Sequence, residues 1–163
     1  MSPTTVDDIL EPYDKLISIF HEAQQVEWTR WSGILPQRVT NVINAHIESG
    51  RKVNFWQNVS YFCIILSAAI PIIVVILVEV LALSHLASLL DAVFPAITAI
   101  VQKKLSSWSK KRYILASVYS PYQLLLSNVI IDIYQGEYNE NSEKHMQKWE
   151  DLDQTLLNAD LTL

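Results

Sequence analysis

The feature that most constrains this sequence is a run of twenty residues without any charge, residues 59–78 (VSYFCIILSAAIPIIVVILV). At about 1.5 Å of rise per residue, a helix of this length spans a hydrocarbon layer of roughly 30 Å. About thirteen of its side chains are large aliphatic or Phe groups, and each favours insertion by roughly 0.3–0.6 kcal/mol, which outweighs the cost of the Ser, Tyr and Pro residues. We therefore expect residues 59–78 to form a membrane-spanning helix.

A second apolar segment, residues 86–102, contains a single acid, Asp91. Alone, a segment of this length also fits the buried core helix of a soluble protein. Beside a strong first span it fits better as the return helix of a hairpin, with Asp91 about 8 Å from the helix start and therefore near an interface. A soluble helical bundle stays as an alternative, but it conflicts with the absence of Lys and Arg over residues 53–102.

Basic residues bracket the two apolar segments. Seven of the twelve Lys and Arg residues flank them, and the stretch between them has none; the seven are Arg51, Lys52, Lys103, Lys104, Lys110, Lys111 and Arg112. By the positive-inside rule, both termini lie in the cytoplasm and the short connection lies outside. We therefore expect a multi-pass protein of the cell (inner) membrane. The same basic residues also suit contact with anionic lipid headgroups, which is compatible with a role in topology.

The sequence before the first span has helical periodicity. Apolar residues recur at steps of three and four through residues 4–27 and 28–49. Pro36 is expected to bend or restart the second of these helices, and Gly50 is expected to end it.

The sequence after the second span is also helical. A long apolar stripe predicts that the second span continues into a cytosolic helix with a kink at Pro121. Residues 135–142 are expected to form a loop, and residues 143–158 a final amphipathic helix.

Together these patterns predict an all-α membrane protein. We expect N-terminal cytosolic helices in residues 1–52 and a two-transmembrane helical hairpin in residues 53–104, with spans at about 59–78 and 86–102. We expect C-terminal cytosolic helices in residues 105–163, the second span being continuous with a long cytosolic helix.

Nothing in the sequence points to catalysis. The net charge of −5 argues against a nucleic-acid partner bound through bulk charge. The single cysteine, Cys63, excludes a disulfide framework, and the four histidines lie in no metal-ligand spacing. No nucleotide-binding or hydrolase motif occurs. We therefore expect no enzyme activity, no cofactor and no metal site.

The most informative pattern is a polar stripe along the second span. Its members are spaced by four, three, four, three and four residues, which places them on one face of a helix: Ser84, Ser88, Asp91, Pro95, Thr98 and Gln102. Lipid offers such groups no hydrogen-bond partner, so the stripe must face water or another helix. It either lines a pore or mediates helix packing, in which case Ser60 and Ser67 of the first span are suitable partners.

Two acids lie near the end of the spans that would form the outer mouth of a pore. In a cyclic oligomer Asp91 would form a ring of carboxylates, which favours cations and repels anions. Glu79 would add a second ring, or it is an exposed acid in the connecting loop. Burial of a lone carboxylate is expensive, which favours a watery position for Asp91.

Four short motifs resemble the SLATT family of SMODS- and SLOG-associating two-transmembrane effectors, and related two-span domains of unknown function. They are Pro71 in Ala69-Ile70-Pro71, the uninterrupted helix after the second span, the Trp108 and Arg112 pair, and Gly136 with Tyr138 after the long helix. The resemblance covers roughly residues 25–138. It implies a pore-forming membrane effector of a bacterial conflict or anti-phage defence system, triggered by a nucleotide-signalling or sensor partner. Each of these residues also has an ordinary structural role, for example Gly136 as a helix C-cap.

Two classes of function follow from these expectations. The first is a homo-oligomeric, cation-permeable two-span channel, a pentamer or hexamer, whose cytosolic helices assemble through stripes such as Leu115, Tyr122 and Val129. The second is a non-conducting membrane adaptor whose cytosolic bundle docks a partner near Trp149. In both, the partners are the lipid bilayer and another protein.

Overall fold

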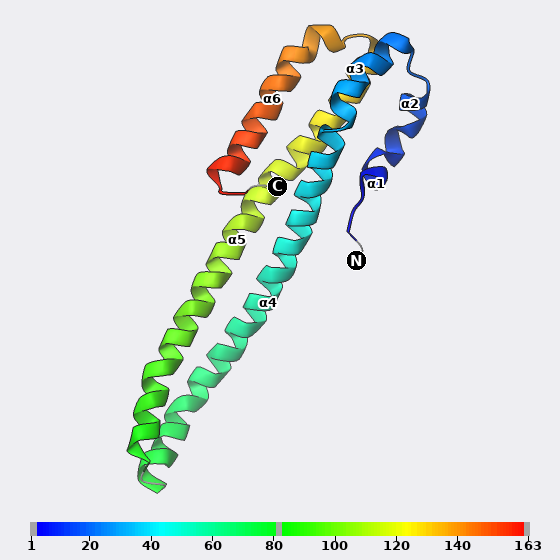
Figure 1. The fold of residues 1–163 in the computed structure, drawn as a ribbon. Helices are drawn as coiled ribbons and strands as arrows, with labels where there is room; N and C mark the ends of the chain where they lie inside the picture. Colours follow the sequence, from blue (N-terminus) through cyan, green and yellow to red (C-terminus); the bar gives the residue numbers. More distant parts are fainter. Residues whose placement is uncertain (1–2, 81–82, 162–163) are drawn as a thin grey trace. The chain divides into compact units, whose positions relative to one another are not determined.

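Every regular element in the described part of the chain is a helix (Figure 1). The computed structural model describes residues 3–80 and 83–161. In chain order the elements are α1 (Val6–Leu10), a 3₁₀ turn (Glu11–Tyr13), α2 (Asp14–Ser18), α3 (Glu22–Ser32), α4 (Leu35–Val75), a π-helical turn (Ile76–Val80), α5 (Ser84–Gln135) and α6 (Tyr138–Asn158). The predicted all-α class is thus confirmed for these residues.

The chain divides into two compact units. One consists of Met1–Glu48 and Lys111–Leu163, and we call it the helix bundle. The other, Ser49–Lys110, holds the C-terminal part of α4 and the N-terminal part of α5, and we call it the antiparallel pair.

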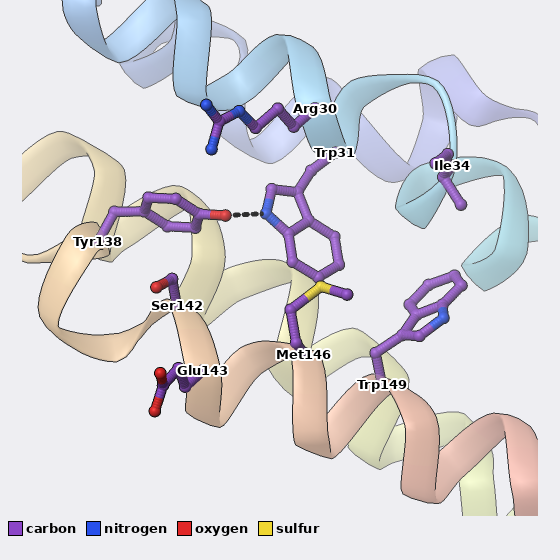
Figure 2. Close-up of a pocket in the computed structure, with 8 residues that line it drawn as sticks. All are labelled: Arg30, Trp31, Ile34, Tyr138, Ser142, Glu143, Met146 and Trp149. Carbon is purple, nitrogen blue, oxygen red and sulfur yellow. Dashed lines mark hydrogen bonds between the residues drawn. The ribbon is translucent and has the colours of Figure 1, made fainter.

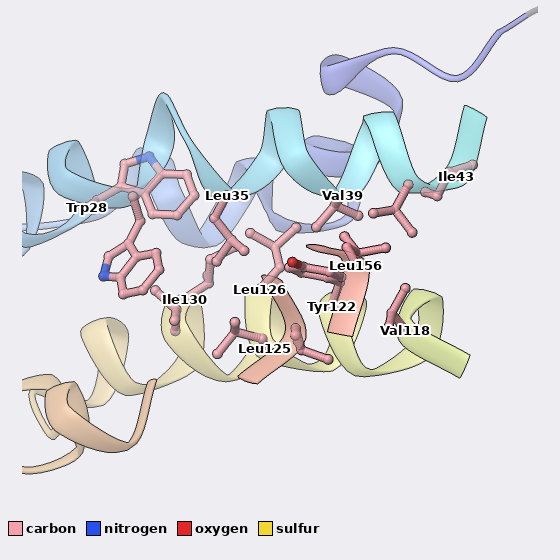
Figure 3. Packing of buried hydrophobic residues seen from close by; sticks show 14 of the residues in the cluster. Trp28, Leu35, Val39, Ile43, Val118, Tyr122, Leu125, Leu126, Ile130 and Leu156 are labelled. Atoms are coloured by element: carbon pink, nitrogen blue, oxygen red, sulfur yellow. The ribbon is translucent and has the colours of Figure 1, made fainter. Parts of the chain in front are cut away.

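The helix bundle has a conventional apolar core (Figure 3). Side chains from α3, α4, α5 and α6 pack around Leu35, Val39, Leu126 and Leu156, none of which is more than 1% exposed. Residues of α1 and α2, together with the turn between them, pack against this core as half-buried side chains. Full burial of one such aliphatic side chain contributes about 1.5–3 kcal/mol, so this core is the main source of the bundle's stability.

The N-terminal helix predicted over residues 4–27 is instead divided into three short helices. Pro12 lies in the 3₁₀ turn, where it cannot donate an amide hydrogen bond to a continuing helix. His21 then caps α3, and the side chain of Gln24 accepts a hydrogen bond from the His21 amide at 2.8 Å. The prediction of one helix was wrong because the apolar periodicity continues across these breaks.

Two predictions about helix breaks in α4 and α5 had different outcomes. Pro36 lies in the first turn of α4, so the expected restart is confirmed. Gly50 does not end the helix: α4 continues to Val75, because a helix-interior glycine costs only about 1 kcal/mol and long helical segments lie on both sides of it. The helix α5 runs through Pro121 without ending, as the predicted continuation of the second span requires.

The turn between α5 and α6 is much shorter than the predicted loop at residues 135–142. Gly136 has a φ of 79°, and its amide donates to the carbonyl of Ile133 at 3.2 Å. The Glu137 amide donates to the carbonyl of Asp132 at 2.9 Å, which completes a Schellman motif. Because this motif closes the turn in two residues, α6 begins at Tyr138 and not at residue 143.

Polar contacts hold α6 against α5 and α4. His145 Nε2 and Asn141 Nδ2 each lie 2.9 Å from the same carboxylate oxygen of Asp132. Near the other end of α6, Arg38 donates through Nε and a terminal nitrogen to one oxygen of Asp153, at 2.9 and 2.7 Å. The hydroxyl of Tyr122 donates to that same oxygen. Burial, with a further contribution from Asp153, raises the pKa of Tyr122 above its usual range, so its hydroxyl stays a donor.

The core predicts a sharp contrast between two leucines of α5. Leu126→Ala should lower the free energy of unfolding of the helix bundle by about 2–5 kcal/mol, because it opens a cavity at a site 1% exposed. Leu124→Ala, at a site 60% exposed two residues away, is the matched control and should cost less than about 0.5 kcal/mol. Thermal unfolding of both purified variants in detergent checks this, and equal losses would contradict the assigned core.

The contacts of Asp153 predict that two aspartates of α6 differ in their contribution to stability. Asp153→Asn should destabilise the bundle by about 1–3 kcal/mol, since it removes a charged acceptor shared by Arg38 and Tyr122. The matched control is Asp151→Asn, because that exposed side chain makes no hydrogen bond within the described residues. Circular dichroism melts of the two variants provide the measurement, and an unchanged melting temperature for Asp153→Asn would contradict the prediction.

Candidate functional site

The two segments of Ser49–Lys110 run antiparallel to each other. The ammonium of Lys52 lies 4.2 Å from the centre of the Trp108 ring, and Gln102 Nε2 donates to Ser60 Oγ at 2.9 Å. At the far end, the amide of Leu83 donates to the carbonyl of Leu77 at 2.7 Å. These contacts place residues 49–52 and 103–110 at one end of the antiparallel pair, which we call the basic end.

A narrow seam joins the two segments. Its members recur at steps of three and four, as in a left-handed pair of coiled helices. Its buried residues include Val53, Ser60 and Cys63 on α4, and Ala87 and Val101 on α5. Small side chains such as Ser60, Cys63 and Ala87 let the two helices approach closely.

Most of the remaining surface of the antiparallel pair is apolar and exposed. Phe62, Ile65, Ile72, Leu89 and Ile100 are each more than half exposed. In the most apolar eighteen-residue windows of Glu22–Glu79 and Ser84–Gln135, only 6% and 11% of the residues are buried. A core helix of a soluble protein would be mostly buried. Both helices are therefore long and apolar enough to cross a membrane, and their exposure argues against a soluble core hairpin.

The predicted polar stripe lies along α5 beside the seam. Ser84, Ser88, Asp91, Pro95 and Gln102 are exposed, and Thr98 is half-buried at the edge of the seam. Four of them follow a seam residue directly (Ala87, Leu90, Phe94 and Val101), and one residue corresponds to about 100° of rotation around the helix. The stripe is therefore a flank of the pair beside the seam, and near the basic end Gln102 still reaches Ser60 of α4.

Several polar groups of the stripe have partners inside the pair. Ser88 donates to the carbonyl of Ser84 at 3.1 Å, and Thr98 to that of Phe94 at 3.0 Å. Gln102 bonds to Ser60 across the seam. Ser67 is exposed and donates to Ile64 of its own helix, so of the two serines only Ser60 joins the helices. Hydroxyl groups that bond within their own helix are tolerated in lipid and do not require a pore.

Asp91 differs from its neighbours in the stripe. Its side chain is exposed, and it makes no hydrogen bond or ion pair within residues 3–80 and 83–161. It lies seven residues, about 10 Å, from the start of α5. Glu79 is an exposed acid in the π-helical turn after α4, and not in an open loop.

The residues that resemble family motifs are divided between the antiparallel pair and the helix bundle. Pro71 lies inside α4 and Trp108 packs on Lys52, both in the antiparallel pair. Arg112 is an exposed residue of the helix bundle. Gly136 is the C-cap described above, and Tyr138 is a buried residue whose hydroxyl accepts a hydrogen bond from Trp31 at 2.7 Å. Gly136 and Tyr138 thus have clear structural roles.

The predicted assembly stripe on α5 lies inside the protomer. Leu115, Tyr122 and Val129 are 2%, 0% and 0% exposed, and they belong to the bundle core. They cannot make contacts with another subunit while the bundle is folded, so that prediction was wrong. The periodicity detected an apolar face correctly, but it could not tell whether that face packs on this chain or on a second copy.

A pocket of about 460 Å³ lies between α3 and α6, and no pattern in the sequence predicted it (Figure 2). It is lined by Arg30, Trp31, Ile34, Tyr138, Ser142, Glu143, Met146 and Trp149. Trp149 packs edge-on against Trp31, with ring centres 6.0 Å apart. Trp31 and Trp149 were visible in the sequence, but nothing local showed that residues 30–34 would face residues 138–149.

The comparisons with known proteins add no assignment. No family model, curated protein or solved structure matches the chain. Within the described ranges, no group of three or more His, Cys, Asp or Glu residues could hold a metal ion. The candidate functional site is therefore the exposed flank of α5 around Asp91.

The hydrogen bond between Ser60 and Gln102 predicts an energetic coupling across the seam. A double-mutant cycle of Ser60→Ala and Gln102→Ala should give about 0.6 kcal/mol, and at most about 1.7 kcal/mol, as measured by unfolding in detergent. The same cycle with Ser67→Ala in place of Ser60→Ala is the control and should show no coupling. Coupling of equal size in both cycles would contradict the assigned partner.

Proposed function

We propose that this protein is a homo-oligomeric, cation-permeable channel with two transmembrane helices in each subunit. The spans at residues 59–78 and 86–102 form a hairpin in the inner membrane, with both termini in the cytoplasm. The apolar, exposed surface of the antiparallel pair supports membrane insertion. The basic residues at one end of the pair support the orientation.

The observation that carries the proposal is the unpartnered carboxylate of Asp91. A charged side chain at the centre of a bilayer costs about 2.5–3.5 kcal/mol even on the mildest scale, and Asp91, about 10 Å from the start of α5, would bear part of this cost if it faced lipid. The hydroxyl groups beside Asp91 bond within their own helix, but its charge has no partner in the described structure. Facing water inside an assembly of several subunits removes this cost, and a ring of such carboxylates attracts cations.

The position of the stripe suits an oligomer. Two helices cannot enclose an aqueous path, so a channel needs several copies of the chain. Because Ser84, Ser88 and Asp91 are exposed on the flank of α5 and make no hydrogen bond to α4 within the described residues, this part of the stripe stays available after α4 has packed. In a pentamer or hexamer, this flank of each subunit would face the central axis, and the apolar outer residues would face lipid.

The resemblance to SLATT effectors suggests a biological role for such a channel. The proposed role is a membrane effector of a nucleotide-signalled bacterial defence system, in which an open pore disrupts the membrane of the host cell. The trigger would come from a sensor partner that acts on the helix bundle.

A non-conducting membrane adaptor is the second candidate, and the pocket between α3 and α6 favours it. Exposed Ile34 and Met146 lie at this pocket beside Trp31 and Trp149, which is the composition of many peptide-binding grooves. A partner bound there would be anchored to the membrane without any ion flux.

Ion flux through liposomes distinguishes the two candidates. The purified protein should conduct K⁺ in preference to Cl⁻, and Asp91→Asn should reduce that preference by roughly five-fold if the ring lowers the cation barrier by about 1 kcal/mol. Asp151→Asn makes the same chemical change in the helix bundle and should leave selectivity unchanged.

Each other outcome of the flux experiment has a definite meaning. Flux with unaltered selectivity in Asp91→Asn would reject the carboxylate ring and keep the channel. An absence of flux with a monomeric mass in detergent would reject the channel and favour the adaptor. An absence of flux with an oligomeric mass would indicate a channel that stays closed without its sensor partner.

A further inference from the structure

The basic end of the antiparallel pair carries all five of the pair's positive charges. Arg51 and Lys52 come from α4, and Lys103, Lys104 and Lys110 from α5. The contact of Lys52 with Trp108 brings the two groups to the same end. The two acids of the pair, Glu79 and Asp91, lie toward the other end, so charge is fully segregated along the pair.

The two lysines at positions 103 and 104 are uncompensated. Both are exposed, and neither makes a hydrogen bond or ion pair within the described residues. On their own helix the nearest acid within the pair is Asp91, twelve residues or about 18 Å from Lys103. That distance exceeds the screening length of about 8–10 Å in physiological salt, so Asp91 does not neutralise them.

An aromatic residue lies beside these charges. Trp108 follows Lys104 by four residues and therefore lies on the same face of α5. Its ring is half-buried and already in contact with the ammonium of Lys52. Tryptophan is enriched at the level of lipid headgroups, where its ring borders the apolar layer and its N–H group meets polar atoms.

We propose that the basic end is a binding surface for the phosphate groups of anionic phospholipids, centred on Lys103, Lys104 and Trp108. An anionic headgroup would balance the charges of Lys103 and Lys104, which have no ion-pair partner within the described residues. Its acyl chains would lie along the exposed apolar surface that begins directly beyond these residues. This inference rests on the membrane insertion in the proposed function, and it is independent of ion conduction.

The test is a lipid titration of the full-length protein, delipidated in a neutral detergent. Phosphatidylglycerol should raise the melting temperature of the wild-type protein, and phosphatidylcholine should not. In Lys103→Gln/Lys104→Gln, the phosphatidylglycerol concentration that gives half of this rise should increase about thirty-fold, which corresponds to about 1 kcal/mol for each basic residue.

Two further variants control for loss of charge and loss of fold. Lys144→Gln/Lys148→Gln removes the same charge from exposed positions of α6 and should titrate as the wild type does. Lys103→Arg/Lys104→Arg keeps the charge and should give the same phosphatidylglycerol titration as the wild type. That result would show that positive charge is what the site requires.

Three results would overturn the proposal: equal stabilisation by both lipids, an unchanged midpoint in Lys103→Gln/Lys104→Gln, or an equal effect of inorganic phosphate without lipid. The last would identify a site for free phosphate. None of these results depends on flux, so the channel could fail while the lipid site stands. A protein that stays soluble and monodisperse after the detergent is removed would reject membrane insertion itself.

Discussion

The physical constraint on which this structure depends is that the exposed apolar surface of the antiparallel pair must be removed from water. Along residues 53–102 the two helices bury only a narrow seam against each other and leave large side chains such as Phe62, Ile72 and Leu89 uncovered. At about 25 cal/mol for each Å² of apolar surface, the transfer of this surface from water into lipid is strongly favourable. The helix bundle differs, because it buries its apolar side chains in a core formed by its own helices.

The polar groups of the antiparallel pair differ in whether they find hydrogen-bond partners within the pair itself. Ser88 and Thr98 satisfy their donors one turn back, and Gln102 reaches Ser60 across the seam. None of them therefore requires water, although all three belong to the face that the sequence suggested as a pore lining. The carboxylate of Asp91 cannot be satisfied in this way, because intrahelical carbonyls accept hydrogen bonds and do not donate them. Of the six residues of the stripe, Asp91 is thus the one that favours a pore over helix packing.

Features that depend on hydropathy and periodicity could be predicted from the sequence. Features that depend on which segments pack together could not. The all-α class, the two apolar helices and the C-cap at Gly136 followed from local patterns. The breaks in the N-terminal helix depend on Pro12 and on a cap at His21, whose weak signals lie within a continuous apolar pattern. The burial of Tyr122 and the pocket beside Trp149 depend on the position of α6. This helix contacts α3, although the two helices are more than a hundred residues apart in the sequence.

The charge asymmetry of the antiparallel pair is more than its helix packing requires. Four of the five basic residues, Arg51, Lys103, Lys104 and Lys110, are exposed and lie outside the buried seam, and their segregation at one end suits an asymmetric surrounding. A membrane with an anionic cytoplasmic leaflet is such a surrounding. In the proposed channel, a cation attracted by Asp91 would next meet the positive field of Lys103 and Lys104, which opposes its passage. Headgroup phosphates bound to these lysines would weaken that field, so the lipid site and the carboxylate ring would favour the same ion.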